Sequence, residues 1–65
     1  MQNIGSIIRE SRERAGLTQE ELAELSRVSV RTVRTLEGGH GNIGIKPLGH
    51  IAQVLGLVFS LKAAA

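Results

Sequence analysis

The chain has 65 residues, of which 42% are hydrophobic and 22% charged, and its formal net charge is +2. This length suits one small domain, residues 1–65, whose core is marginal because such a chain buries only about 60% of its unfolded surface. The absence of cysteine excludes stabilisation by a disulfide or a thiolate metal site, so association with a second copy is an expected source of stability.

Several classes of function are disfavoured by the residue types present. Phe59 is the single aromatic residue, and one aromatic side chain is not enough to bind single-stranded nucleic acid by stacking on its bases. No apolar run approaches the ~18 residues of a membrane span, and the N-terminus does not resemble a signal peptide, so we expect an intracellular, cytoplasmic protein. The chain lacks Asp, Cys, Tyr and Trp, and His40 with Glu37 would supply only two metal ligands. We therefore expect no enzyme activity, no metal and no cofactor.

The first predicted helix covers residues 4–15. Its apolar and small residues recur with helical spacing on one face, which comprises Ile4, Ile7, Ile8, Ser11 and Ala15. Arg12 lies at the edge of this stripe. Gly16 follows directly and is expected to end the helix, since glycine adopts the left-handed conformation that helix C-termini favour.

The second predicted helix starts after Thr18 and carries its own start signal. The spacing from Thr18 to Glu21 is that of a capping box, in which each side chain bonds the backbone N–H of the other residue. Leu22, Ala23 and Leu25 are predicted to face the core. The helix is about two turns long, so it needs tertiary packing to be stable.

A third helix, predicted over residues 30–37 with Ser29 as its N-cap, contrasts with the acidic second helix. If Val33 is at the centre of the buried face, Leu36 and Glu37 lie beside it. The exposed face then carries Arg31, Arg34 and Thr35. Such a face is either an ordinary solvated helix surface or a surface for a polyanion, and helical spacing alone leaves both open.

A glycine-rich loop, residues 38–44, leads to the last predicted helix, with Ile43 or Ile45 as an apolar anchor. Pro47 is expected at the first helical position, where its missing N–H costs nothing. Helical spacing predicts a core-facing stripe of Leu48, Ile51, Ala52 and Leu55. Gly56 is placed to end the helix.

The C-terminal stretch changes period, because Leu57, Phe59 and Leu61 alternate with Val58 and Ser60 as in a strand. A lone strand cannot satisfy its own backbone groups, and a second copy across a two-fold axis is the simplest partner. Residues 57–62 are therefore predicted to be a dimerisation strand. A final helical turn that closes the core is the alternative. The predicted dimer interface comprises Leu57, Val58, Phe59 and Leu61.

The run GLTQEELAELSRVSVRTVRTLEGG resembles the Cro/lambda-repressor-like, or XRE-type, helix-turn-helix family of bacterial and phage regulators. The resemblance extends over about residues 4–57. It implies a mainly α fold: a compact bundle of four to five short helices containing a helix-turn-helix, with a short C-terminal β-strand pairing across a dimer. The second helix of the motif would enter the major groove of DNA.

The resemblance also implies roles for individual residues. Arg31 can form a bidentate fork with guanine, and Val30 can pack on a thymine methyl group. Arg27 stands where the family often has glycine, so a left-handed conformation there would carry modest strain. The implied base-facing residues are Val30, Arg31 and Thr35, with Arg34 at the rim. The implied phosphate contacts are Gln19, which would also support a base-reading side chain, Arg27, Ser29 and Thr32. The implied ion pair, bridging the first and third helices, joins Arg12 and Glu37.

Two functions follow from the resemblance as expectations. The first is sequence-specific binding of a double-stranded DNA operator by a homodimeric transcriptional repressor, associated with the nucleoid of a bacterium or serving a phage. The second comes from residues 41–61, GNIGIKPLGHIAQVLGLVFSL, which resemble the HipB-like antitoxin branch. A member of that branch would bind a toxin protein as well as operator DNA.

Overall fold

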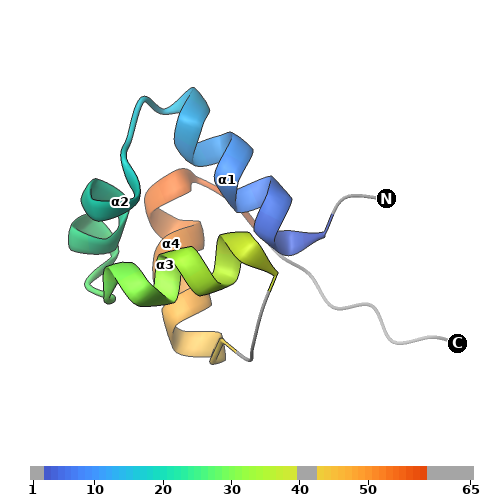
Figure 1. Cartoon of the computed structure of the whole chain (residues 1–65), viewed down its shortest axis with the longest axis vertical. Helices are drawn as coiled ribbons and strands as arrows, with labels where there is room; N and C mark the ends of the chain where they lie inside the picture. Colours follow the sequence, from blue (N-terminus) through green and yellow to red (C-terminus); the bar gives the residue numbers. More distant parts are fainter. Residues whose placement is uncertain (1–2, 40–42, 59–65) are drawn as a thin grey trace, which may run out of the picture.

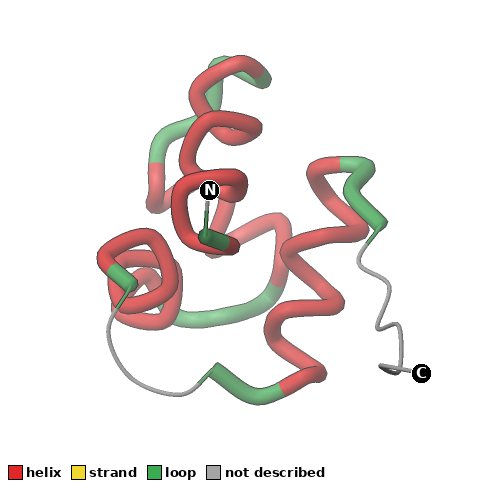
Figure 2. Tube along the Cα trace, turned by 90° about the vertical axis from the view of Figure 1, so that its right-hand side faces the viewer, coloured by secondary structure: helices red, strands yellow, loops and turns green. Residues whose placement is uncertain are grey.

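The computed structural model describes residues 3–39 and 43–58 (Figure 1). Its four helices are α1 (Ile4–Arg14), α2 (Gln19–Ser26), α3 (Val30–Gly38) and α4 (Ile45–Leu55). α3 packs against α1 and α2, and α4 also contacts both of these helices (Figures 1 and 2). This helical bundle with its α2–turn–α3 unit confirms the predicted fold class. None of the four helices combines the length and the hydropathy needed to cross a membrane.

The centre of the bundle takes one fully buried side chain from each helix: Ile8, Leu22, Val33 and Ile51. Burying a side chain of this size contributes about 1.5–3 kcal/mol relative to leaving it in water. Helices of eight to eleven residues are too short to persist alone, so this shared core is what holds them. Val33 and Leu36 form the inner face of α3, as predicted.

Side-chain caps fix where the first three helices begin. The Thr18 N–H donates to Glu21 Oε1 at 2.8 Å and the Glu21 N–H donates to Thr18 Oγ1 at 3.0 Å, which confirms the capping box. Ser29 Oγ accepts from the Thr32 N–H at 3.0 Å, as its predicted N-cap role requires. Asn3 caps α1 in the same way by accepting from the Ser6 N–H.

The predicted inner faces of α1 and α2 are wrong at their edges. On α2, Leu25 is 59% exposed and Ser26 is 2% exposed, because Ser26 falls between Leu22 and Ala23 around the helix axis. On α1, Ile4 and Ala15 are exposed, whereas Gly5 is buried. A Cβ atom at Gly5 would overlap the carbonyl oxygen of Leu36, so this glycine permits the close approach of α1 to the end of α3.

α4 begins two residues earlier than predicted. Gly44 is its N-cap, and the first backbone bond runs from the Leu48 N–H to the Gly44 oxygen at 3.2 Å. Pro47 therefore occupies the third helical position, where its N–H would also have had no helical partner. Ile43 packs against the core while Ile45 is 84% exposed, so Ile43 is the apolar anchor.

The C-terminal end of α4 agrees with the sequence. Gly56 adopts the left-handed conformation at φ 69° and stops the helix. Leu57 and Val58 follow without helical structure. The rest of the predicted strand, residues 59–62, lies outside the described residues, so the strand stays a prediction.

Candidate nucleic-acid interface

The turn between α2 and α3 is built around a left-handed residue that is not glycine. Arg27 has φ 57° and ψ 41°. Its N–H donates to the Glu24 oxygen at 3.2 Å, and the Val28 N–H donates to the Ala23 oxygen at 3.0 Å. The left-handed conformation costs an L-residue roughly 1–2 kcal/mol, which these bonds help to offset. The turn thus places an exposed arginine at the entrance of α3.

The outer face of α3 carries Arg31 and Arg34, the two cations that helical spacing predicts on that face. Arg31 and Arg34 are exposed, and Thr35 on the same face is half-buried. Val30 is also half-buried, since it packs against the hydrophobic core. Only part of its side chain is therefore exposed.

Ser29 and Thr32 already bond to each other at the start of α3. Their hydroxyl oxygens lie 2.9 Å apart, and Ser29 Oγ also accepts from the Thr32 N–H. One hydroxyl hydrogen is used in the bond between the two side chains, so one remains to donate outward. The pair can thus offer a single donor to a phosphate without losing the cap.

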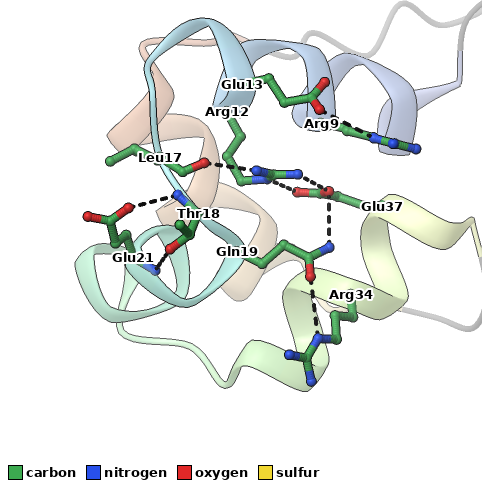
Figure 3. A network of polar contacts seen from close by, with 9 residues as sticks. All are labelled: Arg9, Arg12, Glu13, Leu17, Thr18, Gln19, Glu21, Arg34 and Glu37. Carbon is green, nitrogen blue, oxygen red and sulfur yellow. Dashed lines mark hydrogen bonds and ion pairs between the residues drawn. The ribbon is translucent and has the colours of Figure 1, made fainter.

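The inner edge of α3 is fixed by the ion pair between Arg12 and Glu37. Arg12 Nε and Nη2 donate to the two Glu37 carboxylate oxygens at 2.7 and 2.9 Å (Figure 3). Arg12 Nη1 also donates to the Leu17 carbonyl oxygen at 2.8 Å. The pKa of Arg12 is raised, chiefly by its hydrogen bonds to Glu37, although burial acts in the opposite direction. This bidentate pair holds α3 at a fixed angle to α1.

Gln19 extends this pair toward the outer face. Its Nε2 donates to Glu37 Oε1 at 3.3 Å, and its Oε1 accepts from Arg34 Nε at 3.3 Å (Figure 3). Only the amide nitrogen can donate to a carboxylate, so Glu37 sets the orientation of the amide and turns its oxygen toward Arg34. Gln19 is half-buried and contacts Arg34, the side chain that the resemblance puts at the rim.

Glu20 completes the row of contacts, although it was not among the residues predicted for the site. Arg34 Nη2 donates to Glu20 Oε1 at 3.1 Å, and both side chains are more than half exposed. The signal was available: the first turn of α2 packs beside α3 in a helix-turn-helix, which places a glutamate there near basic residues of α3.

The residues predicted to form a dimer interface are described only in part. Leu57 is half-buried and packs against the core, and Val58 is 91% exposed. Phe59 and Leu61 lie outside the described residues. An open hollow of about 450 Å³ adjoins Leu57 and Val58 and is lined mainly by apolar residues of α4.

Comparison with known proteins decides the family. Residues 8–58 match the family model described as Helix-turn-helix, which is most of the chain. The chain belongs to the XRE-type helix-turn-helix family. Members of this family are DNA-binding transcription regulators, in agreement with the bundle and with the α2–turn–α3 geometry.

Solved structures of other helix-turn-helix proteins superpose well on this family member. The restriction-modification controller protein C.AhdI from Aeromonas hydrophila is 33% identical with a TM-score of 0.78, and the match covers 85% of this chain and 83% of that one. The clp gene regulator ClgR from Corynebacterium glutamicum is 35% identical with a TM-score of 0.75, covering 83% and 57%. The controller protein C.Esp1396I is 29% identical with a TM-score of 0.76, covering 85% and 71%. None of the curated proteins compared with the chain matches it.

Proposed function

We propose that this helix-turn-helix protein binds a specific double-stranded DNA operator as a homodimer and represses transcription by occupying it. The observation that carries the proposal is the construction of α3. Its inner edge is fixed through Glu37 to Arg12, while Arg31 and Arg34 are exposed on its outer face. A rigid helix with outward arginines suits insertion into the major groove.

Within this proposal, the outer face of α3 divides into base and phosphate contacts. Arg31 is the main base-reading residue, because its exposed guanidinium can fork onto guanine O6 and N7. Thr35 and the exposed part of Val30 contact neighbouring bases, and Arg34 lies at the rim. Phosphate contacts fix the register of the helix on DNA without carrying sequence information themselves. These contacts are assigned to Gln19, Arg27, Ser29 and Thr32.

The dimer is supported by apolar surface that runs along α4 to Leu57 and Val58. Ile45 is 84% exposed and Val58 is 91% exposed, and both line the apolar hollow beside Leu57. A monomer of this size gains nothing from exposing these side chains, whereas a second copy would bury them. The surface adjoins the predicted strand at residues 57–62, so strand pairing and helix packing would form one continuous interface.

The related structures favour a regulator over the antitoxin alternative. Two are titled as restriction-modification controller proteins and one as a clp gene regulator. The proposal is therefore a transcriptional regulator without a toxin partner.

Binding-site selection from a random duplex library tests the function and the dimer together. We expect a palindrome whose half-sites lie about 34 Å apart, one turn of DNA, because two-fold symmetry of the protein imposes symmetry on its site. Recovery of no preferred sequence would reject sequence-specific binding. A single, unrepeated half-site would reject the dimer alone.

Substitution of Arg31 by alanine tests the assigned face. Binding to the selected operator should weaken by about 1–3 kcal/mol, and discrimination should be lost at one base pair of each half-site. Fluorescence anisotropy with operators that vary at each position measures both effects. Arg14→Ala is the matched control, since Arg14 is an exposed arginine in the last turn of α1. If Arg31→Ala bound every duplex as tightly as the parent, the outer face of α3 would not be the reading surface.

A further inference from the structure

An open polar hollow of about 300 Å³ lies at the junction of α1, α2 and α3. Its lining combines arginines with the amide of Gln19, and comprises Arg9, Arg12, Gln19, Arg34, Glu37 and Gly38. Arg12 and Glu37 neutralise each other through their bidentate pair. Two positive charges, those of Arg9 and Arg34, are therefore left in the lining.

Both of these arginines are paired with glutamates that do not line the hollow. Arg34 Nη2 lies 3.1 Å from Glu20 Oε1, and Arg9 Nε lies 3.9 Å from Glu13 Oε2. All four side chains are more than half exposed. Ion pairs this exposed are weak, so another anion can replace the carboxylate at little cost.

The geometry of Arg34 allows such an exchange without loss of its position. Its Nε donates to Gln19 Oε1, and Gln19 is oriented by Glu37, as Figure 3 shows. The Glu20 carboxylate meets only Nη2. The guanidinium can thus give up Glu20 and keep its bond to Gln19, with its outer nitrogens directed to a new acceptor.

We propose that this hollow takes a phosphate group of the DNA backbone, with Arg9 and Arg34 as its cations, and that Glu20 competes with the phosphate for Arg34. The inference rests on the proposed DNA-binding function and adds to it an unassigned phosphate contact, Arg9, and an internal competitor, Glu20. In the free protein, Glu20 forms an ion pair with Arg34. When DNA binds, the phosphate replaces the Glu20 carboxylate as the partner of Arg34. Breaking the Arg34–Glu20 pair then reduces the net free energy gained on binding.

The competition has a signature in the salt dependence of binding. Each phosphate neutralised by a protein cation releases counterions and steepens the dependence of log K on log salt by about 0.9. When Arg34 leaves Glu20, the carboxylate takes up a counterion and cancels part of this release. Removing the Glu20 charge should therefore make binding both tighter and more salt-dependent.

The experiment measures the affinity of the full chain for a mixed-sequence duplex at several salt concentrations. Arg9→Gln and Arg34→Gln should each reduce the salt slope by at most about 0.9, because the two arginines share one phosphate and each leaves a carboxylate on binding it, while Arg14→Gln, which removes the same charge elsewhere on α1, should leave the slope unchanged. Glu20→Gln should tighten binding several-fold and steepen the slope. Glu24→Gln removes the same charge from α2, but Glu24 takes part in none of the ion pairs among the described residues. This variant should change neither the affinity nor the salt slope.

Glu20→Gln combined with Arg34→Gln separates competition from a general charge effect. Competition predicts that the double variant binds no better than Arg34→Gln alone. The proposal is overturned if Glu20→Gln tightens binding equally without Arg34, or if the slopes of Arg9→Gln and Arg34→Gln equal that of Arg14→Gln. In both cases the parent still binds DNA, so the proposed function stands. A parent chain that binds no duplex at low salt would overturn the function and the phosphate site together.

Discussion

Two arginine–glutamate pairs join α3 to the neighbouring helices, one on its inner edge and one on its outer face. The Arg12 and Glu37 side chains are 12% and 4% exposed, and two hydrogen bonds of 2.7 and 2.9 Å join them. The Arg34 and Glu20 side chains are 58% and 63% exposed, and one bond of 3.1 Å joins them. The residue types are the same, so the difference between the pairs comes from their surroundings.

Because the inner pair is buried, Arg12 and Glu37 are expected to stay bonded to each other. Because the outer pair is exposed, Arg34 can exchange Glu20 for another anion. Water reaches little of either side chain at the inner edge, so losing one partner would leave a partly buried charge without full compensation. At the outer face water and salt already compete for both charges. A DNA-binding helix needs both properties: a fixed angle to its own protein and cations that can be transferred to another molecule.

The largest expected effect is on the inner pair. Glu37→Gln keeps the shape of the side chain but removes its charge, so Arg12 loses its counter-charge at a site that is 12% exposed. We expect the free energy of unfolding to fall by about 3 kcal/mol, the lower end for a broken buried pair. Urea denaturation followed by circular dichroism measures this change.

Two controls show whether charge is the cause of that loss. Glu24→Gln removes the same charge from an exposed position and should change the free energy of unfolding by less than about 0.5 kcal/mol. Arg12→Met combined with Glu37→Leu replaces both charges by apolar groups and should recover stability relative to Glu37→Gln. A Glu37→Gln protein as stable as the parent would mean that the inner pair does not anchor α3.

A smaller effect is expected at the cap that positions Gln19 between the two pairs. Thr18→Ala removes the hydroxyl that accepts from the Glu21 N–H, and should lower the free energy of unfolding by about 1 kcal/mol. The pKa of Glu21 is lowered by its hydrogen bonds to the Thr18 backbone N–H and to the Thr18 side chain. A carboxyl with a lowered pKa stabilises the fold above its unfolded pKa, and this contribution is lost as the pH falls through its folded pKa.

The same cap therefore predicts a pH dependence. Without the Thr18 side chain the pKa of Glu21 lies closer to its ordinary value, so the variant has less stability to lose on acidification. The difference in unfolding free energy between parent and Thr18→Ala should shrink as the pH is lowered below the ordinary glutamate range. Denaturation curves at neutral and acidic pH test this, and a constant difference would show that the two residues do not form a coupled box in solution.

The sequence predicts well the features that depend on neighbours along the chain. Local hydrogen-bonding chemistry is enough to predict the Thr18 capping box and the Ser29 cap. Helical spacing is enough to predict the two faces of α3, with Val33 inside and Arg31 outside. The left-handed conformation at Arg27 followed from the family resemblance, since nothing local to an arginine predicts it. Local chemistry was thus enough for the starts of α2 and α3 and for the division of α3 into a buried and an exposed face.

The sequence predicts poorly the features that depend on how the helices meet. Gly5 is buried because α1 approaches the Leu36 carbonyl, which hydropathy does not reveal. The assignment of Leu25 to the core failed because α2 contributes only a narrow stripe, with Ser26 at its centre. The bonds of Gln19 to Glu37 and Arg34 join residues 18 and 15 positions apart, so no local pattern marks them.

The smallest expected effect on stability is at the outer pair. Glu20→Gln breaks the bond to Arg34, but both side chains are already hydrated, so we expect the free energy of unfolding to change by less than about 0.5 kcal/mol. The bond from Arg34 Nε to Gln19 is independent of the Glu20 charge and keeps the arginine in place. Urea denaturation at low and high salt measures the change, which should vanish at high salt because exposed pairs are screened. A loss as large as that of Glu37→Gln, persisting at high salt, would mean that the outer pair also serves the fold, and Arg34 would then not be free to leave Glu20 for DNA.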